Sequence, residues 1–186
     1  SFTMAGTVTS LAGDVDGGPS ADGVAASDAH LGIIEGLQTA PDGTLWFTSD
    51  GVIRQVTADG LLRTVSSDPR LGSPRRIAFA SGGTAYVADS AASQVWVIDP
   101  GTQQIRGLSG VSWSTPSSVA VLPSGAVVVA DGDRVWSVPR TGAATVVFGG
   151  GATEPRDDTM SAAATSLSAG PIADVAVAAD GTIAVS

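Results

Sequence analysis

Few side chains in this sequence could carry out acid–base or nucleophilic chemistry. His30 is the only histidine and cysteine is absent, so the chain holds no two-histidine acid/base pair, no histidine-rich metal site and no thiolate centre. Serine is abundant, but no serine lies in a nucleophile-elbow motif. The sequence therefore predicts no catalytic residue, no metal ligand and no cofactor. We expect His30 to pack or to form a hydrogen bond at the end of a connecting segment, with contact to a ligand as the alternative.

Two aspartates recur at equivalent places. Asp89 and Asp131 each end an apolar segment, YVAD and VVAD, whereas Ser49 stands at the corresponding position of the first repeat. In a functional interpretation, these carboxylates belong to a ring that holds a cation or a polar ligand. In a structural interpretation, each accepts N–H bonds from the backbone of the tight turn that follows. The sequence leaves both interpretations open.

Arginines and one tryptophan complete the candidates. Arg75 and Arg76, with Arg70, make SDPRLGSPRR a local positive region, which could contact an acidic partner or a carboxylate ligand, or could pair with the surplus aspartates. Trp113 lies in VSWSTP, between two repeats, where an exposed tryptophan would be a binding anchor. The other tryptophans lie in strand-like segments and are expected to pack between sheets. The candidate ligand-binding residues are Trp113, Asp89, Asp131, Arg75, Arg76 and His30.

The charge balance argues against several partners. The formal net charge is -9, from nine arginines, no lysine, sixteen aspartates and two glutamates. An acidic surface repels phosphate backbones, so we expect no binding to nucleic acid. The sequence has no apolar run long enough to span a bilayer, and we expect no direct membrane contact by this domain.

Glycines mark a repeat of about forty residues. Gly43, Gly83, Gly125 and Gly181 precede apolar segments and are separated by 40, 42 and 56 residues. A second series, Gly60, Gly101 and Gly142, follows the first by 17, 18 and 17 residues. Within a unit the apolar period is two, which predicts four short antiparallel strands. Because such a meander has two apolar faces, neighbouring units must stack, and radial stacking gives an all-β fold, the β-propeller.

The third unit resembles an NHL repeat. Residues 116 to 150, PSSVAVLPSGAVVVADGDRVWSVPRTGAATVVFGG, contain its P-x-x-V-A-V, S-G, V-V-A-D and V-x-x-V segments in order. The connectors GDVDGGPSADGVAASDAHLG and GGGATEPRDDTMSAAATSLSAGP are similar to the long loops of bacterial NHL proteins, although the second lacks the GDGGP core. Abundant Arg, Ala, Gly and Val without lysine favours a GC-rich, actinobacterial source.

The repeats also predict the domain organisation. Residues 1–4 are interpreted as a tag remnant, and residues 5–186 as one NHL-like propeller domain. Its blades are expected near 33–68, 75–110 and 117–150, with a fourth at 172–186 completed by 5–13. About four blades could form a closed ring. Alternatively, the chain is part of a propeller of about six blades, and the final blade obtains strands elsewhere, for example from a second copy in a homo-oligomer.

Two classes of function follow from the resemblance. Similar propellers form extracytoplasmic domains of actinobacterial receptors, which implies a non-catalytic binding or sensor module of a secreted or membrane-anchored protein. Such a module would recognise a small molecule or a protein through loops at one end. The segment GTLWFTSDGVIRQVTADG also resembles repeats of streptogramin lyases, which implies a lyase-like or lactonase-like enzyme. That family uses a second histidine, which this chain lacks, so binding is favoured.

The strand periodicity makes a spectroscopic prediction. Far-ultraviolet circular dichroism should show β-structure with negligible α-helix, because every long apolar segment has a period of two. A helical content above about 20% would contradict the propeller interpretation.

Overall fold

The computed structural model describes residues 10–13, 20–153 and 164–186. In these ranges the chain forms fourteen β-strands and two single-turn 3-10 helices, η1 (Ala26–Asp28) and η2 (Ala164–Ser166). None of the described helices is long and apolar enough to cross a membrane. The described chain is therefore all-β, as the sequence predicted.

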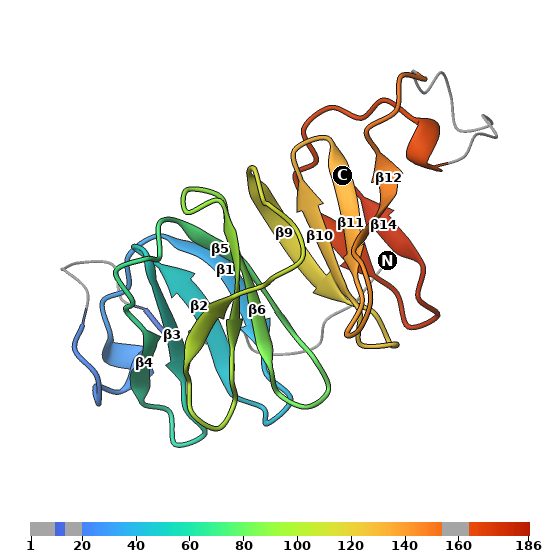
Figure 1. Cartoon of the computed structure of the whole chain (residues 1–186). Coiled ribbons are helices and arrows are strands. Elements are labelled where there is room, and N and C mark those ends of the chain that lie inside the picture. The colour runs from blue at the N-terminus through green and yellow to red at the C-terminus, as the bar shows by residue number, and fades with distance from the viewer. Residues whose placement is uncertain (1–9, 14–19, 154–163) are drawn as a thin grey trace, which may run out of the picture.

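The strands form four antiparallel sheets in chain order (Figure 1). Three sheets have four strands, each paired with the next, and the fourth sheet has two. The first contains β1 (Ile34–Thr39), β2 (Leu45–Ser49), β3 (Val52–Val56) and β4 (Leu62–Ser66). The second contains β5 (Pro74–Phe79), β6 (Ala85–Asp89), β7 (Gln94–Ile98) and β8 (Ile105–Gly107). The third contains β9 (Pro116–Val121), β10 (Val127–Asp131), β11 (Arg134–Val138) and β12 (Thr145–Gly149), and the last contains β13 (Val175–Val177) and β14 (Ile183–Val185).

The turns between the first two strands of each sheet explain the glycine ladder. Gly43, with φ +84°, and Gly181, with φ +88°, adopt a left-handed conformation that favours glycine. In the first of these turns, Asp42 Oδ1 accepts bonds from the Thr44 N–H at 3.0 Å and from its hydroxyl at 2.6 Å. Asp180 accepts the Thr182 N–H in the same way, at 2.9 Å. A repeated D-G-T turn thus joins strands in sheets that lie far apart in sequence.

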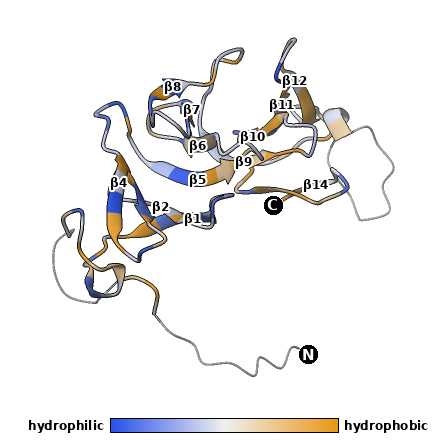
Figure 2. Cartoon of the chain, turned by 90° about the horizontal axis from the view of Figure 1, so that it is seen from below, coloured by the Kyte–Doolittle hydropathy of each residue, from blue (hydrophilic) through white to orange (hydrophobic). Residues whose placement is uncertain are grey.

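Apolar side chains fill the spaces between neighbouring sheets, which fan out around a common axis. In Figure 2, β1, β5 and β9 lie towards the axis, while β4, β8 and β12 lie at the periphery. Between the first two sheets, the Trp46 and Phe79 rings meet edge to face with centroids 5.2 Å apart. Further clusters lie between the second and third sheets and between the third and fourth. Each fully buried Val or Ile contributes about 1.5–3 kcal/mol, so these interfaces provide most of the stabilisation.

The first connector packs on the outer face of the first sheet. Ala29 joins Phe47 and Leu62 in an apolar cluster. The buried guanidinium of Arg54 donates to the Ser20 carbonyl at 2.7 Å and to Asp22 Oδ1 at 3.1 Å. The same face also exposes apolar side chains on and before β1, namely Ile33, Ile34 and Leu37. The fan is therefore open on the β1 side.

The predicted closing strand falls mostly outside the described residues. The predicted strand lies in residues 5–13, of which the structure describes only 10–13. These four residues form no strand. Gly13 donates its N–H to the Ala26 carbonyl at 3.0 Å, which ties it to the first connector. Pairing of this segment, or of a second copy, with β14 stays a prediction.

Gly36 allows the inner strands of the first two sheets to approach. A Cβ atom at Gly36 would lie 1.6 Å from the Arg75 carbonyl oxygen. We predict that Gly36→Ala lowers the free energy of unfolding by at least about 2 kcal/mol, because β1 must move away from β5. Gly82→Ala is the matched control, since nothing lies within 4 Å of its added Cβ, and it should change stability by less than about 0.5 kcal/mol. Equal denaturation midpoints for the two variants would contradict this role.

Acid should destabilise the protein through its turn aspartates. Hydrogen bonds lower the pKa of six described carboxyls below the ordinary 3.8. The largest cause for Asp22 is the Thr64 N–H, and the others are Asp42, Asp59, Asp68, Asp99 and Asp180. A lowered folded-state pKa gives stability that is present above 3.8 and is lost as pH falls through the folded-state values. Urea denaturation should therefore show a falling midpoint between about pH 4 and about pH 2. Asp22→Asn should reduce that drop, and an unchanged pH dependence in this variant would contradict the assignment.

Candidate functional site

Asp89 is a buried structural carboxylate that fixes the entry into β5. Its oxygens accept the Gly72 and Ser73 N–H groups, both at 2.8 Å, and the Ala92 N–H at 3.1 Å. The indole N–H of Trp96 completes the set at 3.0 Å. Only the Ala92 bond lies in the turn that follows β6; the others hold the preceding segment and a neighbouring strand. The buried Asp89 carboxylate thus accepts four hydrogen bonds from groups within the fold.

Asp131 has the same place in the third sheet. It accepts the Ser114 N–H at 3.1 Å and the Thr115 N–H at 2.6 Å, and so holds the chain just before β9. In the first sheet Ser49 replaces it, and the neighbouring Asp50 lies so close to Gly32 that any side chain there would collide with its carboxylate. No group of three or more described His, Cys, Asp or Glu residues could hold a metal ion.

Trp113 is buried, so the condition for a binding anchor in this loop is not met. It is only 8% exposed and packs with Val119 and Val95 between the second and third sheets. Its indole N–H donates to the Leu108 carbonyl at 3.3 Å. The loop folds inward because the Trp113 ring fills the space between two sheets. Little of the ring surface is therefore available for contact with a partner.

His30 belongs to the first connector. Its backbone N–H donates to Ser20 Oγ at 2.8 Å, and its carbonyl accepts the Ser20 N–H at 3.0 Å. The imidazole Nδ1 is enclosed and lacks a hydrogen-bond partner among the described residues. No described carboxylate orients the ring, so a histidine–carboxylate pair is absent from the part of the chain that the structure describes.

The two remaining candidates, Arg75 and Arg76, face the axis from β5. The pairing of β5 with β6 is irregular between Pro74 and Ile77, and both arginines are exposed between these buried neighbours. The bulge places two consecutive side chains outside the sheet. Arg70, the third arginine of this stretch, pairs instead with Asp68, which lowers the pKa of that carboxyl to about 2.

Carboxylates from two other sheets meet these arginines. Arg75 lies 4.0 Å from Glu35 of β1, whose other oxygen accepts the Ser73 hydroxyl at 3.3 Å. Arg76 pairs at 2.8 Å with Asp174, which precedes β13 and lies 98 residues away. The second oxygen of Asp174 accepts the Ser118 hydroxyl at 2.6 Å. We call Glu35, Arg75, Arg76, Asp174 and Ser118 the axial cluster.

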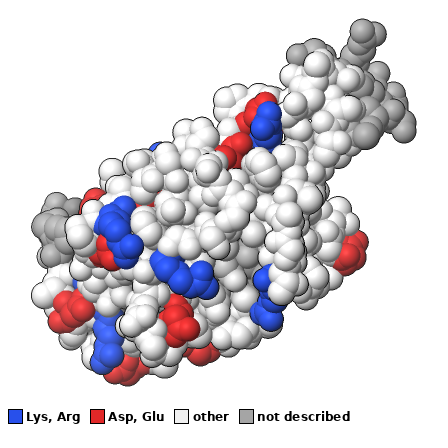
Figure 3. Space-filling view, in the orientation of Figure 1, with Lys and Arg blue, Asp and Glu red and all other residues white. Residues whose placement is uncertain are grey.

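The axial cluster combines cationic donors with anionic acceptors. Its charged side chains keep 35% to 54% of their surface exposed, so a ligand could reach them. Of the two ion pairs, Arg75–Glu35 is the longer, at 4.0 Å against 2.8 Å for Arg76–Asp174. Figure 3 shows positive and negative side chains interspersed on one face, without one dominant charged patch. The cluster can thus recognise charge, and its one hydroxyl, that of Ser118, is buried and donates to Asp174.

Asp174 was missed as a candidate although the sequence holds a signal. Arg76, Ser118 and Asp174 each directly precede a buried aliphatic residue on the innermost strand of their sheets. Aligning those aliphatic positions would have placed the three side chains at one level around the axis. The repeated glycines mark the other end of these strands and carry no information about this position.

Comparisons with known proteins support the fold. No family model matches the chain, and no curated protein matches it. Among solved structures, virginiamycin B lyase from Staphylococcus aureus is similar, with TM-score 0.52 and 18% identity over 61% of this chain and 40% of that one. A putative gluconolactonase gives TM-score 0.58 and 16% identity over 82% and 53%, and the WD40 β-propeller domain of Doa1 gives 0.57 and 18% over 85% and 48%.

These likenesses and the radial sheets define the class of the molecule. The chain has the β-propeller fold, with three complete blades and two strands of a fourth among the described residues. It spans about half the length of the solved propellers that it resembles. At such low identities the likeness shows the fold alone.

The buried carboxylate predicts a large stability effect. Asp89→Ala should lower the free energy of unfolding by at least about 3 kcal/mol, because four donors lose their acceptor inside the protein. Asp133→Ala is the control, since the only ion pair of this exposed residue with the described residues is a 3.6 Å contact with Arg134, and its effect should stay below about 0.5 kcal/mol. Similar melting temperatures for both variants would refute the structural role.

Proposed function

We propose that the chain is a non-catalytic recognition module built from NHL-type repeats. It binds a small molecule or a protein segment at the axial cluster. The observation that carries the proposal is the convergence of Glu35, Arg75, Arg76 and Asp174 from three sheets, with all four side chains partly exposed.

The charges favour a ligand that carries both an anionic and a cationic group. Arg75 offers N–H donors to a carboxylate, and Glu35 offers acceptors to an ammonium or guanidinium group. A 4.0 Å separation between the two is long for an ion pair, so a ligand that inserts between them gives up little existing interaction. The 2.8 Å ion pair between Arg76 and Asp174 would hold β5 and the segment before β13 together beside the ligand.

The same proposal includes a cellular context. The NHL-like connectors and their resemblance to receptor domains support an extracytoplasmic location, on a secreted or membrane-anchored protein of actinobacterial type. A lyase-like or lactonase-like activity is the alternative, and two similar propellers bear such names. The isolated, enclosed His30 favours binding over that alternative.

A paired binding experiment tests the proposal. N-acetyl-Glu-Lys-amide should shift the backbone amide signals of β1 and β5 in nitrogen–proton NMR spectra, whereas N-acetyl-Gln-Gln-amide should not. Arg75→Gln should weaken binding of the charged dipeptide about tenfold, because a charge-assisted hydrogen bond contributes about 1.5–3 kcal/mol. Arg63→Gln, an exposed arginine on β4, should leave it unchanged.

Enzyme assays test the alternative that the chain is a lyase-like or lactonase-like enzyme. We expect no turnover of lactones, esters or streptogramin-like cyclic depsipeptides. Hydrolysis or elimination that disappears in His30→Ala would establish the enzyme alternative. Absence of dipeptide shifts at the axial cluster would remove the basis of the binding proposal.

A further inference from the structure

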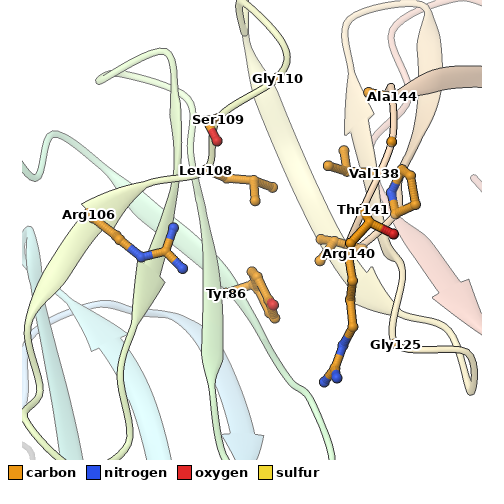
Figure 4. A pocket seen from close by; sticks show the side chains of 13 residues that line it. Tyr86, Arg106, Leu108, Ser109, Gly110, Gly125, Val138, Arg140, Thr141 and Ala144 are labelled. Atoms are coloured by element: carbon orange, nitrogen blue, oxygen red, sulfur yellow. The ribbon is translucent and has the colours of Figure 1, made fainter.

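A second candidate site lies away from the axis, between the second and third blades. The cleft has a volume of about 370 Å³ and is bounded by Tyr86 of β6, by β8 and the residues that follow it, and by the turn between β11 and β12. That volume is in the range of small-molecule sites. Figure 4 shows Arg106 on one wall, Arg140 on the other and Tyr86 between them. We call this the interblade cleft.

The two arginines of the interblade cleft differ from most others in the protein. Among the eight described arginines, five have a carboxylate oxygen within 4.0 Å, at Arg54, Arg70, Arg75, Arg76 and Arg134. Arg63, Arg106 and Arg140 have no such ion pair with described residues, and two of these three line one cleft. In a chain of net charge -9, unpaired cations that gather at one place call for an explanation.

The lining gives the cleft a positive character. Its thirteen lining residues, all within the described chain, include no aspartate or glutamate. Asp99 interacts only weakly with Arg106: hydrogen bonds from Thr102 and Gly101 are the main causes of its lowered pKa, and the charge of Arg106 is the smallest cause. The Tyr86 hydroxyl is a further donor, and it forms no hydrogen bond with described residues. Two arginines, a tyrosine and no anionic residue thus line the same cleft.

The remaining lining residues are apolar. Leu108, Val138 and Ala144 line the cleft and pack on the apolar cluster between the second and third sheets. The absence of a side chain at Gly125 leaves room for Arg140, whose Nε would lie 2.8 Å from a Cβ there. A ligand in the cleft would therefore meet guanidinium groups at one part and aliphatic side chains at another.

We propose that the interblade cleft binds a small aromatic or aliphatic organic anion, with its carboxylate or phosphate on Arg106 and Arg140 and its apolar part against Leu108, Val138 and Ala144. Arginine forms bidentate bonds with both kinds of anionic group. The Tyr86 hydroxyl donates to the same group. This site is independent of the axial cluster and survives if binding there fails.

Calorimetric titration of the whole chain with benzoate, phenyl phosphate and neutral benzamide tests the site. Benzoate or phenyl phosphate should bind, and the stronger of the two identifies the preferred anionic group. Benzamide should bind at least about tenfold more weakly, because it keeps the ring but lacks the charge. Equal affinity for benzamide, or no binding of either anion, would overturn the proposal.

Variants assign the binding to the cleft. Arg106→Gln and Arg140→Gln should each weaken binding of the anion about tenfold, and Tyr86→Phe should weaken it about threefold. Arg63→Gln removes a third unpaired arginine outside the cleft and should have no effect. Circular dichroism confirms the fold of each variant. A loss in Arg63→Gln equal to that in Arg140→Gln would show non-specific attraction to positive charge, and so would contradict a built site.

Discussion

The need to cover both apolar faces of a sheet is the constraint on which the molecule depends. The second strand of the third sheet, β10, is buried at all five positions, from Val127 to Asp131. A strand of this kind cannot face water on either side, so its sheet needs a neighbour on each face. The second blade receives these neighbours from the first and the third. On the first blade, the connector that carries Ala29 and His30 covers part of the face that has no described sheet beside it.

Apolar packing alone would not fix where each inner strand begins. Asp89 and Asp131 do this by binding the backbone just before β5 and β9. Because the carboxylates are buried, each of these bonds is protected from water. Arg75 and Arg76 follow Ser73 after one intervening residue, Pro74, so the position of these arginines depends on the buried Asp89 carboxylate. The segment that the buried carboxylate holds and the arginines of the proposed site are thus separated by only a few residues.

The fold was predictable from sequence because its signals are local. The glycine ladder marks turns that need left-handed backbone, and the apolar period of two marks strands, so the propeller followed without knowledge of distant contacts. The candidate sites were less predictable because they join residues that are distant in sequence. Arg76 and Asp174 meet only when blades two and four face one axis. Arg106 and Arg140 share a cleft only after two blades have packed. The burial of Trp113 was not predictable from its loop position for the same reason, since the packing of neighbouring blades decides whether a loop side chain lies inside or outside.

The irregular pairing at the start of the inner strands has an evolutionary consequence. The strands β1, β5 and β9 each show a register shift near their first residues. The pairs that occupy this place differ from blade to blade: Glu35 and Gly36, Arg75 and Arg76, Ser117 and Ser118, then Ala173 and Asp174. The surrounding apolar positions, by contrast, keep their character in each repeat. Gene duplication of one blade would therefore give descendants a shared scaffold with independently variable axial side chains, and selection could change what the axis recognises one blade at a time.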